Sequence, residues 1–300
     1  MRVVSLLPSA TEIALALGLS EELVGVTFEC DHPADPRVGR AVVVGGLATA
    51  GLTPGEIDAL VRAKVAAGED MYRLDEEMFR GLDPDVVLTQ DLCRVCALPS
   101  GDVEAAMTSL GCRSEIVTLH PHSLADIFDD IAAIGRATGT APAADVLVAQ
   151  LQARLASVRD AVAPAIAQHG RPRVFVLEWP DPPFVAGHWV PELVSAAGGE
   201  TVLARPGERS VPTTWEDIAT TEADIVVVAS CGFDVTGTAQ HAREVISRLP
   251  PHVAVWAIDA NGLMVRPGPR VVDGVETLAA IIHGVGEVRP DHAALIRAGR

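Results

Sequence analysis

The sequence predicts an α/β protein in which two Rossmann-like lobes are bridged by a single long α-helix. Apolar residues recur at steps of three or four between residues 140 and 170, which is the spacing of one helix face. Before and after this segment, short β-branched runs alternate with helical patterns, which predicts mostly parallel sheets covered on both faces. Because the two halves repeat the same order of elements, we predict one lobe over residues 1–139, the bridging helix over 140–170 and a second lobe over 171–300.

The bridging helix has recognisable ends. Thr140 with Pro142 supplies a start, and Gly170 followed by Pro172 supplies a stop, because Gly accepts the left-handed cap and Pro cannot continue a helix. Pro164 lies inside the pattern and predicts either a kink or an earlier end near residue 163. The apolar face consists of Leu147, Leu151, Leu155, Val158, Val162 and Ile166.

Each lobe is expected to place its loops at the ends of parallel strands. In the first lobe we expect strands at residues 3–7, 23–27, 40–44, 86–89 and 116–119, and helices at 11–17, 54–66, 75–81, 101–110 and 123–137. In the second lobe we expect strands at 174–177, 225–229 and 253–258, and helices at 191–197, 214–220, 239–248 and 271–282. Ligands bind outside the carboxyl ends of such strands, so the loops after the strands are the expected site.

Charge and composition exclude several classes of partner. The chain has 300 residues and a formal net charge of −17, and nucleic-acid affinity depends on Lys and Arg, so neither nucleic acid nor an anionic membrane surface is expected as a partner. Pro8 and Glu12 interrupt the apolar start of the chain, which does not resemble a secretory leader. No apolar run reaches the roughly 18 residues of a membrane span. We therefore expect a cytoplasmic protein without membrane insertion.

Four segments of the chain resemble a known family. They are residues 4–12 (Val-Ser-Leu-Leu-Pro-Ser-Ala-Thr-Glu), the long helix, Gly187-His188-Trp189, and residues 266–274 (Arg-Pro-Gly-Pro-Arg-Val-Val-Asp-Gly). Together they are similar to the substrate-binding proteins of ABC importers for cobalamin and siderophore-type iron chelates, and most similar to the cobalamin-binding members. The resemblance implies a class III periplasmic-binding-protein-like fold, a corrinoid (cobalamin) or other metal chelate held between the lobes, and an ABC permease as partner.

A large flat ligand of this kind is expected to contact aromatic faces and a few polar groups. Ser9 and Glu12 are also explained by a capping box at the first helix, and the aromatic residues by ordinary core packing. The candidate ligand-binding residues are Ser9, Glu12, Tyr72, Glu178, Trp179, Phe184, His188, Trp189, Arg266 and Arg270.

Several thiols and imidazoles lie on the expected strand-end loops. Cys93 and Cys96 form a CxxC pair, Cys30 and His32 form a CxH pair, and Cys231 follows a strand of the second lobe. Thiolate and imidazole are ligands of zinc, iron and other borderline metals, so these residues are the candidate metal ligands. A redox pair and a purely structural role remain as alternatives for the thiols.

No catalytic residue is predicted, because the chain has no nucleophile elbow, P-loop or dinucleotide fingerprint. The pair His120 and His122 could hold a metal or act as a general base, or could cap the following helix and face solvent.

Two hypotheses for the function follow. The first is a cytoplasmic binding protein that carries a corrinoid without chemistry, and the second is a metal- or thiol-dependent enzyme or metallochaperone that uses the Cys/His cluster.

Overall fold

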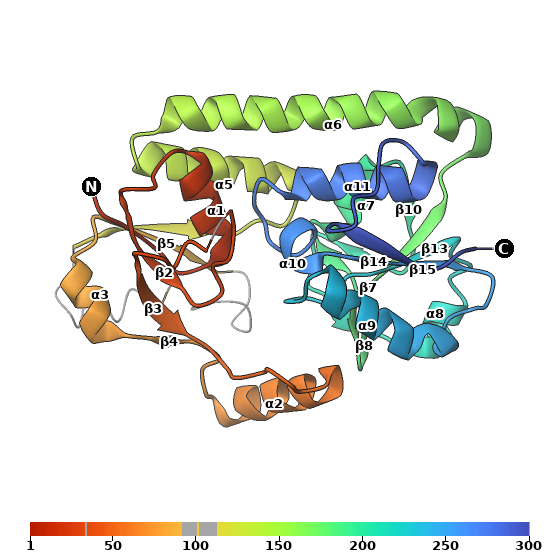
Figure 1. The fold of residues 1–300 in the computed structure, drawn as a ribbon, viewed down its shortest axis with the longest axis horizontal. Coiled ribbons are helices and arrows are strands. Elements are labelled where there is room, and N and C mark those ends of the chain that lie inside the picture. Colours follow the sequence, from red (N-terminus) through yellow and green to blue (C-terminus); the bar gives the residue numbers. More distant parts are fainter. Residues whose placement is uncertain (34, 92–100, 102–112, 300) are drawn as a thin grey trace. The chain divides into compact units, whose positions relative to one another are not determined.

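The computed structural model describes residues 1–33, 35–91, 101 and 113–299, and the chain divides into two units. Unit 1 contains Met1–Pro121 and Ala125–Ala149, and unit 2 contains His122–Leu124 and Gln150–Arg300. Each unit has a sheet with helices packed on it, as the sequence predicts (Figure 1). Among the helices of the described residues, none has both the length and the apolar character that crossing a membrane requires.

The sheet of unit 1 has the strand order β4-β3-β2-β1-β5-β6. All its neighbouring strands pair in parallel except β4, which pairs antiparallel with β3 at the edge. The strands are β1 (Val3–Ser5), β2 (Leu23–Thr27), β3 (Ala41–Gly45), β4 (Arg73–Leu74), β5 (Val86–Gln90) and β6 (Glu115–Leu119). The helices are α1 (Pro8–Ala16), α2 (Pro54–Ala67), α3 (Glu76–Leu82) and α5 (Leu124–Ala137).

The core of unit 1 explains why its strands read as continuous apolar runs. Val4, Val43 and Val87 are fully buried, and the ring of Phe79 from α3 packs with them. Strands that are covered on both faces cannot alternate apolar with polar residues. The β-branched runs in the sequence therefore mark the central strands of this sheet.

Helix α6 (Ala141–His169) is continuous through Pro164. The expected earlier end near residue 163 is wrong, and the helix ends where Gly170 adopts a φ of 78°. Residues 141–149 of this helix belong to unit 1 and residues 150–169 belong to unit 2. Within unit 2, Arg154 binds Asp273 and Glu276 of α11 (Val271–His283), which attaches this part of α6 to the helix beside it.

The main sheet of unit 2 has the order β12-β8-β7-β13-β14-β15, and β10 also pairs with β7. Its centre, β7 (Arg173–Pro180), β13 (Ile225–Val228) and β14 (Ala254–Ile258), is parallel. The other strands of this sheet are β8 (Pro183–Val185), β10 (Glu200–Thr201), β12 (Val211–Pro212) and β15 (Ala293–Arg297), and β9 (Gly187–His188) and β11 (Arg205–Pro206) pair in parallel as a separate two-stranded sheet. The helices are α7 (Val190–Ala196), α8 (Trp215–Ala219), α9 (Val235–Val245), α10 (Ala260–Leu263) and α11, with a 3₁₀ turn at Ile246–Arg248.

The sequence did not predict β4, β8–β12, β15 or α10, which have two to five residues each. The expected helix at 239–248 begins at Val235, because Asp234 caps it and accepts a hydrogen bond from the Gly237 N–H. The predicted capping box of Ser9 and Glu12 at the start of α1 is wrong. The N-cap of α1 is Leu7 without a side-chain cap, and Pro8 occupies the first turn instead. The expected helix at 101–110 lies outside the described residues, apart from residue 101.

Candidate functional site

An aromatic cluster lies at the carboxyl ends of β7 and β13 in unit 2. We call Trp179, Phe233 and His241 the Trp179 cluster. The ring centroids of Trp179 and Phe233 are 6.0 Å apart, and those of Phe233 and His241 are 4.6 Å apart in an edge-on arrangement. Trp179 and Phe233 are half-buried. Their rings therefore offer apolar surface at the edge of the sheet where ligands of α/β proteins bind.

His241 supports this cluster from inside the unit. Its side chain belongs to α9, is 5% exposed, and its Nδ1 lies 3.0 Å from the Oγ of the fully buried Ser230. Burial lowers the pKa of His241 below its ordinary value. The imidazole is therefore favoured in its neutral form, in which it packs against the Phe233 ring without the cost of a buried charge.

Glu178 connects β7 to the loops beside it. Its carboxylate accepts the Ser210 Oγ–H at 2.6 Å and the Gly187 N–H at 3.3 Å. Gly187 fits this place because a Cβ would lie 2.5 Å from the carbonyl oxygen of Glu208 and from the backbone nitrogen of Ser210. The Glu178 carboxylate thus holds together two loops of unit 2.

Phe184, another candidate, is half-buried on β8 and pairs across the strand with Trp179.

His188, Trp189 and His122 form a second group of rings in unit 2. The His188 ring centroid is 6.1 Å from that of His122 and 5.7 Å from that of Trp189. The backbone of His188 has a φ of 50°, a conformation that is uncommon for residues other than Gly. Trp189 is 4% exposed and its indole N–H donates to the Met264 carbonyl at 2.8 Å. The indole N–H of Trp189 is therefore hydrogen-bonded inside unit 2, whereas the rings of His122 and His188 are half-buried.

A carboxylate and two guanidiniums gather after β14. Asp259 caps α10 and accepts the Gly262 N–H at 3.0 Å. Burial raises its pKa above the ordinary value, while the hydrogen bond from Gly262 and the charges of Arg270 and Arg266 oppose this rise. A Cβ on Gly262 would collide with the Asp259 carboxylate and the Arg270 guanidinium, so these two groups approach each other over the glycine. Arg266 is 7% exposed and Arg270 is half-buried.

Unit 1 has its own aromatic pair beyond the strand ends. Phe28 follows β2 and Tyr72 precedes β4, and their ring centroids are 6.3 Å apart. Both rings are half-buried. Ser9 and Glu12, in contrast, are only 2% and 6% exposed on α1. Tyr72 is therefore the candidate of this unit with the most surface for a ligand, and Phe28 is its neighbour.

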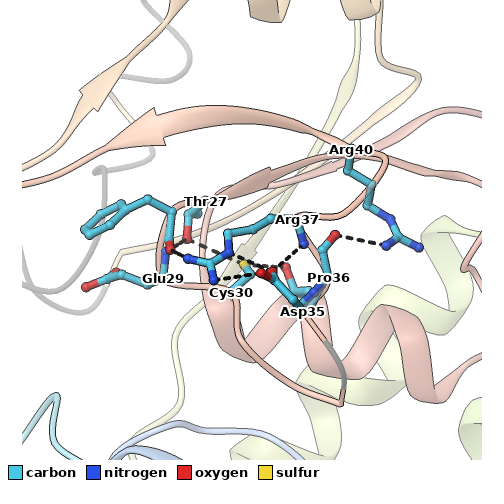
Figure 2. A network of polar contacts seen from close by, with 9 residues as sticks. Thr27, Glu29, Cys30, Asp35, Pro36, Arg37 and Arg40 are labelled. Atoms are coloured by element: carbon cyan, nitrogen blue, oxygen red, sulfur yellow. Dashed lines mark hydrogen bonds and ion pairs between the residues drawn. The ribbon is translucent and has the colours of Figure 1, made fainter.

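The loop around Cys30 is fixed by two arginines (Figure 2). Arg37 donates to Asp35 through Nε and Nη2 and to the Phe28 carbonyl through Nη1 at 2.7 Å. The Arg37 side chain lowers the pKa of Asp35. Arg40 donates to the carbonyls of Leu23 and Pro36. These bonds hold the backbone that positions Cys30 and the Phe28 ring.

The described part of the chain shows no group of three or more His, Cys, Asp or Glu that could hold a metal ion. Cys30 is 1% exposed, with its Sγ 3.1 Å from Thr11 Oγ1 and 3.5 Å from Thr27 Oγ1 in unit 1. His32 is half-buried in unit 1, and Cys231 is exposed in unit 2. Cys93 and Cys96 lie outside the described residues, so the predicted zinc or iron site stays a prediction.

The histidines of the HxH pair are divided between the units. His120 is exposed in unit 1, where its backbone N–H bonds Asp130, and His122 belongs to unit 2, where its Nδ1 lies 3.0 Å from the Gly207 carbonyl. Four of the site residues described above were not among the candidates: Phe28, Phe233, His241 and Asp259. The two phenylalanines stand in strand-end loops, and that position was a usable signal. His241 lies in a helical pattern, where nothing marked it.

Comparison with known proteins places the chain in a family. The family model described as "Periplasmic binding protein" matches residues 3–255. An uncharacterized ABC transporter substrate-binding lipoprotein of Bacillus subtilis is 26% identical over 288 residues, which cover 94% of this chain and 80% of the relative. A cobalamin-binding protein of Halobacterium salinarum is 28% identical over 294 residues, covering 94% and 69% of the two chains.

The fold comparison agrees with the sequence comparison. The crystal structure of a periplasmic heme-binding protein from Pseudomonas aeruginosa superposes with a TM-score of 0.68 at 20% identity, and covers 95% of this chain and 94% of that one. At this identity the likeness concerns the fold alone, which is the two-lobe α/β fold that the sequence predicts. Since the family model spans most of the chain, this protein belongs to the periplasmic binding protein family.

Proposed function

We propose that this protein binds a corrinoid such as cobalamin and presents it to an ABC permease. The observation that carries the proposal is the Trp179 cluster at the carboxyl ends of β7 and β13, in a chain that belongs to the periplasmic binding protein family. Half-buried aromatic rings suit a large flat ligand, because they bury apolar area without losing much side-chain entropy. The cobalamin-binding relative from Halobacterium salinarum favours a corrinoid over other chelates.

The polar residues near this cluster suit a ligand with several amide groups. Corrinoid side chains present amide donors and acceptors, and Asp259, Arg266 and Arg270 supply a carboxylate and two guanidiniums beyond β14. Because Arg270 is half-buried, its guanidinium can bind a ligand oxygen with less competition from water than a fully exposed group. Heme, whose propionates are anionic, and an iron chelate are the competing ligands of the same chemical class.

The test is a calorimetric titration of the reduced, untagged protein with cyanocobalamin, aquocobalamin, hemin and a ferric siderophore. We expect one-to-one binding of a corrinoid, and preferential binding of hemin would replace the corrinoid in the proposal. Trp179→Ala should weaken binding by about tenfold or more, because a large aromatic contact is lost. Trp215→Ala is the matched control, since Trp215 of α8 stacks on Arg248 and lies outside the cluster. Absence of binding to all four ligands would refute the function.

The cytoplasmic location stays a prediction and is an alternative to delivery to a permease, because ABC importers receive their ligand outside the cytoplasm. Fractionation of cells of the native host, followed by immunoblotting, tests it directly. Recovery of the protein with the membrane or outside the cell would contradict it.

A further inference from the structure

Residues His122–Leu124 are fixed to unit 2 at both ends. The Nδ1 of His122 lies 3.0 Å from the carbonyl oxygen of Gly207, and the Leu124 N–H donates to the Glu192 carboxylate at 2.8 Å. Gly207 directly follows β11, and Glu192 stands in the first turn of α7. Two elements of unit 2 therefore hold a three-residue segment in which the imidazole of His122 is the one ring.

These contacts bring the ring of His122 close to that of His188. The two ring centroids are 6.1 Å apart. Gly207 contacts both residues, because its carbonyl bonds the His122 ring and its N–H donates to the His188 carbonyl at 2.9 Å. His120, the neighbour of His122 in the HxH pair, belongs to unit 1 instead. The structure therefore pairs His122 with a histidine from a distant part of the sequence.

The backbone of His188 is held in an uncommon conformation. Its φ is 50°, and its N–H donates to the Glu208 carbonyl at 2.6 Å. The preceding Gly187 allows this close approach, since a Cβ there would lie 2.5 Å from the same carbonyl oxygen. Residues other than Gly cost free energy at such a φ, and those that keep it are concentrated at functional sites. The folded unit thus fixes the position of His188 at an energetic cost.

The hydrogen bond at Gly207 determines the tautomer of the neutral His122 ring. A carbonyl oxygen only accepts, so Nδ1 carries the proton and Nε2 carries the lone pair. Histidines that bind metals commonly donate their other ring N–H to a backbone carbonyl in this way. Two imidazoles that bind one zinc ion at about 2.0–2.1 Å have ring centroids about 5–6 Å apart. The observed separation of 6.1 Å is close to this range.

We propose that His122 and His188 bind one borderline divalent metal ion, for which Zn²⁺ is the probe. Imidazole nitrogen favours zinc, copper and nickel, whereas magnesium and calcium prefer oxygen ligands. The formal net charge of −17 attracts cations to the protein. Among the described residues no third His, Cys, Asp or Glu joins the pair, so water completes the coordination. This site lies within unit 2 and does not depend on the proposed function.

Equilibrium dialysis of the reduced, untagged protein against Zn²⁺ tests the assignment. We expect the pair to bind one ion with a Kd of about 1–100 µM, because two protein ligands bind more weakly than the four of a structural zinc site. His122→Asn and His188→Asn should each weaken this binding by about tenfold or more. Asparagine at position 122 keeps an amide N–H for the Gly207 carbonyl, and asparagine at position 188 tolerates the left-handed backbone.

His120→Asn is the matched control, because His120 is an exposed imidazole of the same HxH motif in unit 1. It should bind as much zinc as the wild type. Zinc held by cysteines is common to the wild type and the three variants, so the loss of one ion per chain reports the histidine pair. Equal stoichiometry and affinity in all four proteins would overturn the inference, and so would a loss that His120→Asn reproduces.

Nuclear magnetic resonance of the imidazole nitrogens gives a measurement on the wild-type protein, which does not depend on the folding of a variant. Zn²⁺ should shift the Nε2 signal of His122 and a ring nitrogen signal of His188 at the same zinc concentration. The signals of His292, whose Nδ1 lies 3.0 Å from Thr277 Oγ1, should stay unchanged. A zinc-induced shift at one ring of the pair alone, or at neither, would overturn the inference.

The melting temperature supplies a third measurement. Zinc should raise the melting temperature of His120→Asn more than that of His122→Asn and His188→Asn, because an ion that binds only the folded state stabilises it. An equal rise in these three variants would contradict the histidine pair as a binding site.

Discussion

Replacing Asp130 by asparagine should stabilise the protein near neutral pH and leave its stability at acidic pH unchanged. Asp130 lies on α5 in unit 1, and its Oδ2 is buried without a hydrogen-bond partner among the described residues. Burial raises its pKa from 3.8 to about 7, against the opposing hydrogen bond from the His120 backbone N–H, and Asp126 and Asp129 raise it further. The native state therefore disfavours the charged carboxylate.

The direction of the pH effect on stability follows from the order in which the unfolded and native states lose the Asp130 proton. As pH rises from about 4 to about 7, the unfolded chain releases the Asp130 proton while the native state retains it, so the free energy of unfolding falls. A shift of this size corresponds to about 4 kcal/mol at most, reached above pH 7. Asparagine keeps a carbonyl that accepts the His120 N–H and never carries a charge. In Asp130→Asn the free energy of unfolding should therefore not fall as the pH rises.

Urea unfolding followed by circular dichroism, at several values between about pH 4 and pH 8, measures the effect. We expect the free energy of unfolding of Asp130→Asn to exceed that of the wild type by a few kcal/mol at the highest pH, and the two curves to converge at the lowest. Asp145→Asn is the matched control, because Asp145 of unit 1 is exposed on α6 and is not among the groups that shift the Asp130 pKa. A difference that is independent of pH, or one that Asp145→Asn reproduces, would refute the reasoning.

Three further predictions follow from particular contacts. Gly187→Ala should lower the free energy of unfolding by about 2 kcal/mol or more, seen as a lower melting temperature, because its Cβ would meet the backbone of Glu208 and Ser210. Thr53→Ala should cost about 1 kcal/mol of α2 stability and speed amide hydrogen exchange in this helix, while the global melting temperature stays unchanged because α2 buries only Pro54. NMR titration should place the pKa of His241 below 6.5, and a value at or above 6.5 would contradict its burial against Ser230.

The sequence predicted the long elements well because they depend on local pattern. Helix α6 follows an apolar period and ends at Gly170, and the strand at Leu23–Thr27 is observed with the predicted bounds. The two-residue strands β9 and β11 could not be predicted, because they exist only where the loop at Arg205 reaches Gly187 in the folded unit. Pro164 illustrates the reverse case, since packing keeps a helix intact where the local rule allows a break.

The candidate binding residues stay predictions, and the sequence argument found only some of the side chains that the structure groups with them. Trp179 was a candidate partly because it stands in a loop after a predicted strand, and Tyr72 because the resemblance implies aromatic contacts with the ligand. Phe233 and Phe28 also stand in loops after strands, but their pairing with Trp179 and Tyr72, like the approach of His241 to Trp179, depends on tertiary contacts that the sequence does not show. Trp189 stays a candidate, and its indole N–H donates to the Met264 carbonyl inside unit 2.

Residues His122–Leu124 belong to unit 2 although the residues on both sides of them belong to unit 1. The Leu124 N–H donates to the Glu192 carboxylate at 2.8 Å, and His122 bonds Gly207, so this short insertion is built into the second unit. No single cut in the chain can therefore yield two complete halves. Fragment complementation should work poorly with a break at residue 139 or 149, because the second fragment would lack these three residues. Circular permutation, which keeps all of them in one chain, is the better route to rearranging this protein.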